Sequence, residues 1–337
     1  MPPPVAPWRL LVAVLTTLGT LVTVTPASAV PAPGGGSTTV EVVPQVSPTP
    51  QELAVTGPAR PVPGTVRVTV GRTVDQATVT GTEEVLRAAG ATRVVTTASG
   101  ATGAAATADF PLTVHLTASA VDPDTASVLR DRRAPEPGDL PAEGYVLAAG
   151  PVDGRRHAVL AGADPTGTYY ALQTLRQLLV SRPGPDLLPA VAIRDWPATP
   201  DRGTIEGFYG TPWSQADRLR HLDFAGAHKL DTYVYAPKDD PWHRERWREP
   251  YPAERLAEFA ALAERARLRH VDLVFAVSPG QSVCHSDDAD FAALTAKTQA
   301  LHDVGVRSFA LFFDDIAEQL SCPADRDRFG ADRSPSA

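Results

Sequence analysis

From residue 202 to residue 313 the sequence alternates short apolar runs with segments whose apolar residues recur at helical spacing. The short runs predict strands, and the segments between them predict helices that pack one face against a sheet. Because strand and helix follow one another in turn, we expect β-α units with parallel strands. The predicted strands are residues 202–207, 232–236, 271–277 and 308–313. Three helices are predicted between them: one that begins at Ser214, one at 253–269 and one at 288–304.

Two features of these units bear on how they pack. The strands at 272–277 and 309–313 are almost continuously apolar, which is typical of strands covered on both faces. The helices are expected to bury one stripe each, formed by Leu256, Phe259, Leu262 and Ala266 in the first and by Phe291, Leu294, Thr298 and Leu301 in the second.

Such units form either a doubly wound sheet or a (β/α)8 TIM barrel. Polar residues follow the strands, and barrel enzymes build their sites at the carboxyl ends of the strands, so we favour the barrel. A complete barrel takes about 250 residues, more than follow residue 200 here. We therefore expect residues 200–337 to be the first half of a catalytic barrel in a truncated chain, with unpaired sheet edges and an uncovered apolar interior.

Residues 38–196 predict a small mixed α/β domain of the α/β class. Strand-like runs occur at 66–70, 112–116, 145–149 and 157–161, and a helix is predicted at 166–179 after Asp164 and Pro165. A Gly-, Ala- and Thr-rich loop is expected at 97–108. No nucleotide loop or metal signature occurs, which favours an accessory domain. The proline-bearing segment 195–200 marks its junction with the barrel.

The N-terminus resembles a secretory signal peptide at residues 1–29. Arg9 precedes an uncharged run at 10–24 that ends in Ala27-Ser28-Ala29. The run is shorter than the roughly 20 residues of a membrane span, so a retained anchor is the weaker alternative. Residues 30–37, rich in Pro and Gly, predict a flexible leader. The protein is thus expected to be secreted and extracellular, with no membrane association after signal removal.

The charge and the cysteine content limit which classes of partner, disulfide and metal site the chain can have. With 39 acidic and 31 basic residues the formal net charge is −8, and no basic stripe suits a nucleic acid. Cys284 and Cys322 are the two cysteines; in an oxidising compartment they can form a disulfide or remain two free buried thiols. A metal site would need further ligands at suitable spacing, and none is evident, so no metal is expected.

Asp314 and Asp315 follow the last apolar strand directly. Two neighbouring carboxylates repel, which raises the pKa of one of them and lets a site keep one acid protonated beside an ionised neighbour. Taken alone, such a pair is more often a helix cap, a turn or a cation ligand than a catalytic pair.

The other strand ends are also rich in functional groups. They comprise Glu206-Gly207-Phe208-Tyr209-Gly210-Thr211-Pro212-Trp213, the polar and aromatic run 235–244, and Ser278-Pro279-Gly280. Glycines allow close approach of a ligand to the backbone, and aromatic rings offer faces for sugar stacking. The alternatives are a tight turn with core aromatics, a solvated charge run and a simple turn, respectively.

Four segments, EGFYG at 206–210, YAPKDD at 235–240, SPG at 278–280 and FALFFDDI at 309–316, together resemble the family 84 glycoside hydrolases, the O-GlcNAcases and bacterial hyaluronidase-like β-N-acetylglucosaminidases. The resemblance runs from about residue 202 to 319. The preceding segment is only loosely similar to the α/β domain of bacterial members.

The resemblance implies hydrolysis with retention of configuration, in which the acetamido group of the substrate is the nucleophile and an oxazoline is the intermediate. Most retaining glycosidases use an enzyme carboxylate as the nucleophile instead. Asp314 would hold the acetamido N–H, and Asp315 would be general acid and then general base. The backbone of Gly207 and the side chain of Lys238 would bind sugar hydroxyls. No cofactor is implied. The substrate would be a glycan or glycoprotein carrying N-acetylglucosamine in terminal or internal linkage.

Two alternatives stay open. The family also uses a Tyr, Asn residues and a further Asp from the second half of the barrel, which this chain does not contain, so an inactive or carbohydrate-binding fragment is the second reading. A chitinase-like enzyme is the third. It would close the fourth-strand motif with a Glu, whereas here the motif closes with Asp315 and Ile316.

Overall fold

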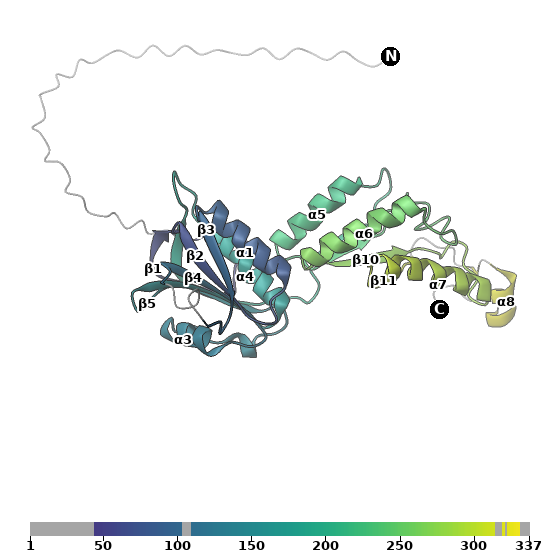
Figure 1. Ribbon diagram of the computed structural model, residues 1–337. Coiled ribbons are helices and arrows are strands. Elements are labelled where there is room, and N and C mark those ends of the chain that lie inside the picture. Colours follow the sequence, from purple (N-terminus) through teal and green to yellow (C-terminus); the bar gives the residue numbers. More distant parts are fainter. Residues whose placement is uncertain (1–43, 103–108, 314–318, 321, 331–337) are drawn as a thin grey trace, which may run out of the picture. The chain divides into compact units, whose positions relative to one another are not determined.

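The computed structural model describes residues 44–102, 109–313, 319–320 and 322–330 (Figure 1). The chain divides into two units, Met1–Thr38 and Thr39–Ala337, and all described residues belong to the second. Asp314 and Asp315 lie outside the described residues. No helix in the described part of the chain is long and apolar enough to cross a bilayer.

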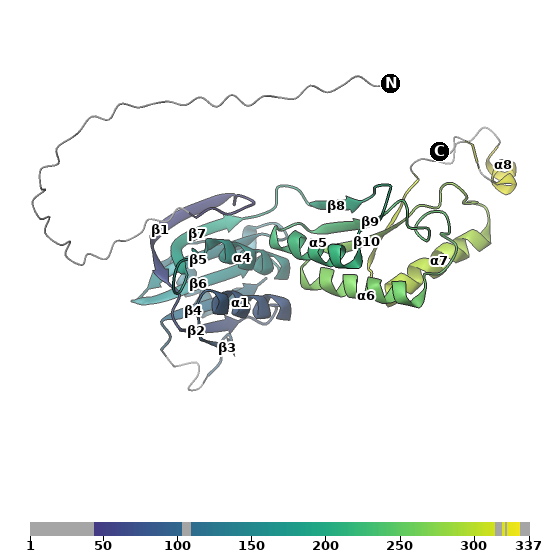
Figure 2. The same cartoon turned by 90° about the horizontal axis from the view of Figure 1, so that it is seen from above.

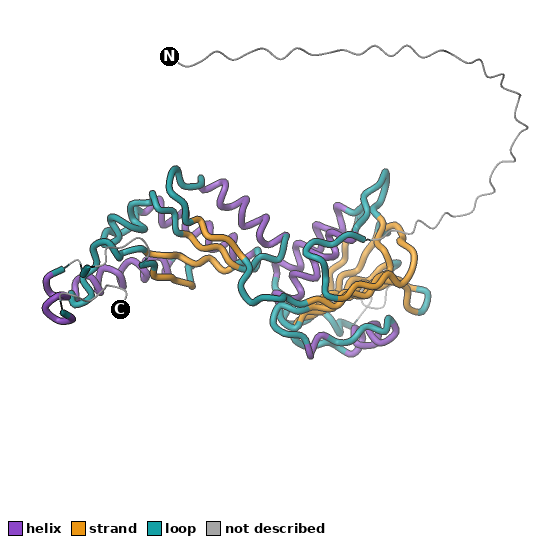
Figure 3. Tube along the Cα trace, turned by 180° about the vertical axis from the view of Figure 1, so that it is seen from behind, coloured by secondary structure: helices purple, strands orange, loops and turns teal. Residues whose placement is uncertain are grey.

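The first sheet has seven strands in the order β1-β7-β5-β6-β4-β2-β3. Helices pack on both of its faces, as the purple and orange segments of Figure 3 show. Its strands are β1 (Glu52–Pro61), β2 (Thr65–Val70), β3 (Arg93–Ala98), β4 (Leu112–Ala118), β5 (Tyr145–Val152), β6 (Arg155–Gly162) and β7 (Leu187–Asp195); its helices are α1 (Gln76–Ala88), α3 (Pro123–Asp131), a 3-10 turn (Pro137–Asp139) and α4 (Pro165–Leu178).

The alternation of side chains along the strands gives this sheet two cores. Leu160 of β6 and its neighbours on one face pack with α1 and α4, whereas Val159 and Ala161 on the other face pack with Leu129 of α3. Both cores are formed by buried, mainly aliphatic residues, and the first also contains tyrosine rings. The mixed α/β prediction for this part of the chain is therefore confirmed.

Each long helix of the first sheet begins at an aspartate N-cap. Asp75, Asp122 and Asp164 accept hydrogen bonds from the backbone N–H three residues later, at 2.9, 3.1 and 2.8 Å. This arrangement satisfies one of the free N–H groups that every helix start presents. The Asp-Pro start of α4 is the signal by which its helix was predicted from the sequence.

Several elements of the first sheet are not evident in the sequence. β1 and β7 were missed because both contain prolines, which are rare in sheets. Pro189 fits because β7 pairs with β5 only from Val191 to Asp195, and β1 is an edge strand with irregular register. The loop predicted at 97–108 is wrong at its start, since Thr97 and Ala98 end β3 and pair with β2.

The second sheet has four strands, all parallel and adjacent in sequence order, β8-β9-β10-β11. Figure 2 shows β8, β9 and β10 side by side. The strands are β8 (Gly203–Glu206), β9 (Thr232–Tyr235), β10 (Asp272–Val277) and β11 (Ser308–Leu311); the helices are α5 (Gln215–Ala227), α6 (Ala253–Leu268), α7 (Asp288–Asp303) and α8 (Pro323–Phe329). Sequential order without reversal is the order of a (β/α)8 barrel, and a doubly wound sheet would reverse it. The barrel prediction is confirmed for these strands.

One face of this sheet is covered by helices. Tyr235 and Phe275 pair across β9 and β10, and both rings contact Phe259 of α6, at centroid distances of 4.9 and 5.6 Å. On the opposite face Ile205 is 60% exposed, and its neighbour Val234 is half-buried. Among the described residues this sheet is therefore covered on one face only. The uncovered interior predicted for a half barrel is present, and the cover on both faces that the apolar strands indicate is not.

The buried stripe of α7 also differs from the prediction. Phe291 is 72% exposed, and the buried positions are Asp290, Lys297 and Leu301. Leu301 is buried and Leu294 packs against the core as predicted, but Asp290 and Lys297 are buried in place of Phe291 and Thr298. Both are charged side chains with distant partners: Asp290 binds Arg248, and Lys297 binds the carbonyl of Trp242. An apolar pattern cannot reveal such positions. In α6, Phe259, Leu262 and Ala266 are buried as predicted and Leu256 packs against them.

Lys297 holds α7 against the segment after β9. Its Nζ donates to Trp242 O at 2.7 Å and lies 4.6 Å from the centroid of the Tyr251 ring. The side chain is 4% exposed, and this burial lowers the pKa of Lys297 to about 8, although Asp240 and Glu249 act in the opposite direction. The ammonium is therefore held in the protein interior at the expense of stability.

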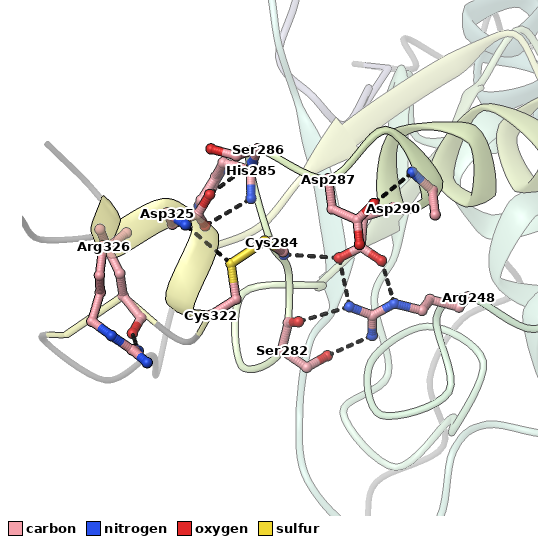
Figure 4. Close-up of a disulfide and its surroundings, with 12 residues drawn as sticks. Arg248, Ser282, Cys284, His285, Ser286, Asp287, Asp290, Cys322, Asp325 and Arg326 are labelled. Atoms are coloured by element: carbon pink, nitrogen blue, oxygen red, sulfur yellow. Dashed lines mark hydrogen bonds and ion pairs between the residues drawn. A yellow bond between two sulfur atoms is a disulfide. The ribbon is translucent and has the colours of Figure 1, made fainter. Parts of the chain in front are cut away.

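A disulfide joins Cys284, in the loop after β10, to Cys322, the N-cap of α8 (Figure 4). The buried carboxylate of Asp325 in α8 accepts hydrogen bonds from the backbone N–H groups of His285 and Ser286, at 2.8 and 2.7 Å. Two independent links, one covalent and one polar, thus attach α8 to the loop after β10.

On the other side of the same loop, Asp290 forms a second set of contacts. Arg248 donates to both carboxylate oxygens of Asp290 and to the carbonyl of Ser282, and the N–H of Cys284 donates to Asp290 at 2.8 Å (Figure 4). The hydrogen bond from Arg248 lowers the pKa of Asp290. The loop is therefore anchored at both of its ends.

Replacement of Lys297 by Met should change the pH dependence of stability. The pKa of Lys297 is about 8 in the folded protein, below its ordinary value of 10.5, so between these pH values the unfolded chain binds the proton more tightly. The free energy of unfolding therefore falls as the pH is lowered from 10.5 to 8, and this group changes it no further below pH 8. Relative to Lys297→Met, the free energy of unfolding of the parent should rise by up to about 3 kcal/mol between pH 8 and 10.5. Urea unfolding at several pH values measures it. Gln299→Met, a non-titrating exchange at an exposed position of the same helix, is the control and should keep the parental slope. Parallel curves for the parent and Lys297→Met would contradict the assignment.

The double substitution Cys284→Ser, Cys322→Ser should destabilise the chain. The bond closes a loop with a sequence separation of 38 residues, and the chain-entropy relation gives roughly 4 kcal/mol for a loop of this length. Denaturant unfolding should show this loss. Dithiothreitol should reproduce it in the parent and leave the double variant unchanged, and equal unfolding midpoints for the oxidised parent and the variant would refute the expectation.

Candidate functional site

The segments that follow the four strands of the second sheet meet at one edge. Backbone hydrogen bonds join them in pairs: Ala236 N to Glu206 O at 3.2 Å, Lys238 N to Phe208 O at 3.1 Å, and Phe312 N to Val277 O at 2.9 Å. Parallel strands place their carboxyl ends together, and here backbone pairing continues up to three residues beyond the strand ends. The segments singled out in the sequence are thus neighbours in space.

Glu206, the last residue of β8, is fully buried and bound on every side. Arg218 of α5 donates to both of its carboxylate oxygens at 2.8 Å, and the backbone N–H of Trp213 donates to one at 2.9 Å. Tyr233 donates its hydroxyl to the same carboxylate. Burial, and after it the charge of Glu206, raises the pKa of Tyr233, which keeps its hydroxyl a donor. Glu206 is therefore a structural centre and not a free acid.

The aromatic residues after β8 divide into two groups. Phe208 and Tyr209 are 38% and 61% exposed. Trp213 instead packs among the core aromatics, 5.1 Å from the ring of His221 and 6.4 Å from that of Tyr233. Two rings are thus available to a ligand at this edge, and Trp213 has the core role that the sequence left open.

Arg244 supports the exposed Tyr209. Its Nη1 donates to the Tyr209 hydroxyl at 3.1 Å, and the guanidinium lies 5.5 Å from the ring centroid. Arg244 itself is 9% exposed. In the sequence Arg244 is one member of the polar run 235–244 and has no evident role. The fold places it beside Tyr209, which follows a different strand.

The two acidic residues after β9 have different environments. Asp240 is buried and accepts hydrogen bonds from the hydroxyls of Tyr235 and Tyr251, at 2.6 and 2.8 Å, and from the N–H of Trp242 at 3.0 Å. Asp239 is exposed and accepts from the N–H of Gly210 at 2.9 Å. Asp240 therefore fixes the loop internally, whereas Asp239 ties it to the loop after β8.

Gly207 and Lys238, predicted to bind sugar hydroxyls, lie on these two adjoining loops, and both are half-buried. A Cβ on Gly207 would come within 3.1 Å of the Ile205 side chain, a tighter contact than side chains usually make. Glycine thus leaves its backbone open where a larger residue would crowd the strand end. The sugar-binding roles of both residues stay predictions.

His243 and Ser278 link the third strand to the loop after β9. The backbone N–H of Ser278 donates to His243 O at 2.9 Å, and His243 Nδ1 donates to Ala276 O at 2.7 Å. Both residues are buried. This contact was not foreseen, since nothing in the sequence around His243 indicates that its ring faces a backbone carbonyl of β10.

Asp314 and Asp315 follow Phe313, the last described residue before them. The ring of Phe313 lies 5.9 Å from that of His285, in the disulfide-bonded loop. Their catalytic roles stay predictions, because both residues fall outside the described part of the chain.

Among the described residues one group has metal-ligand composition: Cys284, Cys322 and Asp325, whose ligand atoms lie within 4.8 Å of one another. The two sulfur atoms are bonded to each other, so neither is a thiolate that could bind a metal. The Asp325 carboxylate is already occupied by backbone N–H groups.

Comparison with known protein families agrees with this division of the chain. Residues 202–336 match the model of the β-N-acetylglucosaminidase family, and residues 43–196 match that of glycosyl hydrolase family 20, domain 2. The first match covers all four strands of the second sheet and includes Asp314 and Asp315.

Individual relatives show the same resemblance. The Protein O-GlcNAcases of Rattus norvegicus and Mus musculus are each 38% identical to this chain over 129 residues, which is 38% of this chain and 14% of theirs. Among solved structures, that of CpGH84B is 32% identical with a TM-score of 0.68 and covers 81% of this chain and 44% of its own. That of CpGH84D, 24% identical with a TM-score of 0.69, shows a likeness of fold.

The chain thus spans 14% of the length of the curated relatives and under half of the solved structures that it resembles. Family model, curated relatives and the structure of CpGH84B nevertheless agree on one group. The chain belongs to the family 84 glycoside hydrolases, the family of β-N-acetylglucosaminidases that includes the O-GlcNAcases.

Proposed function

We propose that the protein is a secreted, retaining β-N-acetylglucosaminidase that hydrolyses N-acetylglucosamine linkages of extracellular glycans or glycoproteins. The observation that carries this proposal is the family match over residues 202–336, which includes the segments after all four strands of the second sheet. Those segments adjoin one another through backbone hydrogen bonds, so one ligand can contact several of them.

The proposed reaction uses the substrate as its own nucleophile. The acetamido carbonyl oxygen attacks the anomeric carbon, the bond from that carbon to the leaving oxygen breaks, and Asp315 gives its proton to the leaving oxygen. Asp314 accepts the acetamido N–H and stabilises the positive charge that develops on the ring. Water then attacks the anomeric carbon, Asp315 takes its proton, and the oxazoline opens. Two inversions give net retention, and neither carboxylate becomes covalently attached.

The described side chains suit the binding part of this proposal. Phe208 and Tyr209 expose aromatic faces, and Tyr209 is held in place by Arg244. Lys238, on the adjoining loop, can donate up to three hydrogen bonds from one flexible ammonium group, which fits the hydroxyls of a sugar. We assign this edge to the sugar, with Gly207 contributing through its backbone.

Secretion rests on two independent features. Within residues 1–29 one charged residue, Arg9, precedes an uncharged run and a small-residue triplet, as in signal peptides. The two cysteines form a disulfide, and such bonds persist in oxidising compartments and are rare in the cytosol. We therefore place the substrate outside the cell.

Asp315→Asn should lower kcat on 4-nitrophenyl β-N-acetylglucosaminide by about 10² to 10⁴, the usual contribution of a general acid-base group. The assay is run on the purified chain and on a fusion that adds the second half of the barrel from a family 84 relative. Asp327→Asn, at an exposed position in α8, is the matched control and should leave the rate unchanged. Absence of turnover in both forms, with sugar binding retained, would replace the hydrolase by a carbohydrate-binding protein.

The substrate-assisted route predicts both stereochemistry and inhibition. The first product seen by proton NMR should be the β-anomer, and a thiazoline analogue of the oxazoline should inhibit competitively, with weaker inhibition of Asp314→Asn. Initial release of the α-anomer would exclude this mechanism even if the protein hydrolyses the substrate.

A further inference from the structure

A cleft of about 870 Å³ lies at one edge of the seven-stranded sheet. Its lining comes from residues that precede β2 and β4 and from the turn between β5 and β6, so it is located where β2, β4 and β6 begin. The volume is in the range of small-molecule pockets. The candidate site described above follows strands of the other sheet, and the cleft is thus a separate feature with no role in the proposed reaction.

The wall of this cleft is stiff. Five of its lining residues are prolines: Pro58, Pro61, Pro63, Pro111 and Pro151. Proline has a fixed φ and no N–H, so these positions offer apolar ring faces and no backbone donors. A preformed wall reduces the ordering cost of binding, and any hydrogen bonds to a ligand must come mainly from side chains.

The charged side chains of the cleft are three arginines and one aspartate. Arg155 is paired with Asp109, from Nε to Oδ1 at 3.0 Å. Arg156 donates to Pro61 O at 2.7 Å, and no carboxylate among the described residues pairs with Arg156 or Arg60. Three positive charges and one negative charge leave +2 in the cleft, within a chain whose formal net charge is −8.

The two unpaired arginines are close enough to influence each other. Burial, and after it the charge of Arg60, lowers the pKa of the half-buried Arg156. An anion bound between them would relieve this repulsion. The planar guanidinium suits a carboxylate in particular, because its N–H groups match the two oxygens in a bidentate arrangement.

We propose that this cleft binds a carboxylate-bearing saccharide, with the carboxylate between Arg60 and Arg156 and the sugar ring against the prolines. The saccharide part of this proposal rests on the proposed function, since a secreted glycosidase encounters its substrate among glycans. A dense polyanion such as a nucleic acid fits poorly, because the cleft offers two compensating charges and the rest of the acidic chain repels it.

Isothermal titration calorimetry of the full chain with tri-galacturonate tests the proposal, and this probe lacks the acetamido group that the proposed catalytic site requires. We expect binding that weakens with salt and is lost with the methyl-esterified, neutral trimer. Arg60→Gln and Arg156→Gln should each weaken binding about tenfold or more. Arg220→Gln removes the same charge from an exposed position of α5, away from the cleft, and should leave binding unchanged.

Arg60 is the decisive position, because its side chain is exposed and we expect its replacement to leave the fold intact. Equal binding of the methyl ester, undiminished binding to Arg60→Gln, or acetate binding as tightly as the trimer would each overturn the proposal. Hydrolysis of 4-nitrophenyl β-N-acetylglucosaminide by Arg60→Gln should equal that of the parent. Since the calorimetry needs no turnover, failure of the hydrolase proposal and failure of this one give different results.

Discussion

The buried ion pair between Glu206 and Arg218 is the contact on which the second sheet depends. It ends β8, orients α5 and takes a hydrogen bond from Tyr233 of β9, so three consecutive elements share one carboxylate. A charge in the interior is tolerated only when its partners are complete, and removing one partner of such a pair typically costs about 3–5 kcal/mol. Because the exposed residues Phe208 and Tyr209 are separated from Glu206 by Gly207 alone, this carboxylate fixes the point from which they extend.

Buried charge recurs throughout the layer that supports the candidate site. Asp240 holds two tyrosine hydroxyls, Lys297 holds the carbonyl of Trp242, and Asp290 holds Arg248. Each of these groups fixes a loop and not a strand. Apolar contacts are not directional, so they alone do not fix the conformation of a loop. A hydrogen bond to a charged group fixes both the distance between donor and acceptor and their orientation. The loops after β9 and β10 therefore have a defined conformation without being part of the sheet.

The second sheet was predictable because its signals are local. Helical spacing, strand length and the alternation of elements predict it to within a few residues, and the sequential order of the strands confirms the barrel arrangement. The errors arise where a partner lies far along the chain. The apolar pattern of α7 predicts Phe291 as a core residue, but the buried neighbour is Asp290, which pairs with Arg248. Likewise, nothing near Glu206 in the sequence shows that its carboxylate is paired with Arg218. Residue type indicated where the site would form, but only the fold distinguishes its supports from groups free to act.

The two sheets differ in when they can form during synthesis. In the second, each new strand pairs with the one made just before it, so every addition extends a structure that already exists. In the first, β1 pairs with β7, and Glu52 and Arg194 are 142 residues apart. Contacts of such separation carry a high loop-closure entropy and form slowly. The edge of the first sheet therefore stays open until nearly all of it has emerged. β1, whose partner in the sheet is β7, is made first and waits longest for that partner, which makes it the element most dependent on protection from aggregation before folding is complete.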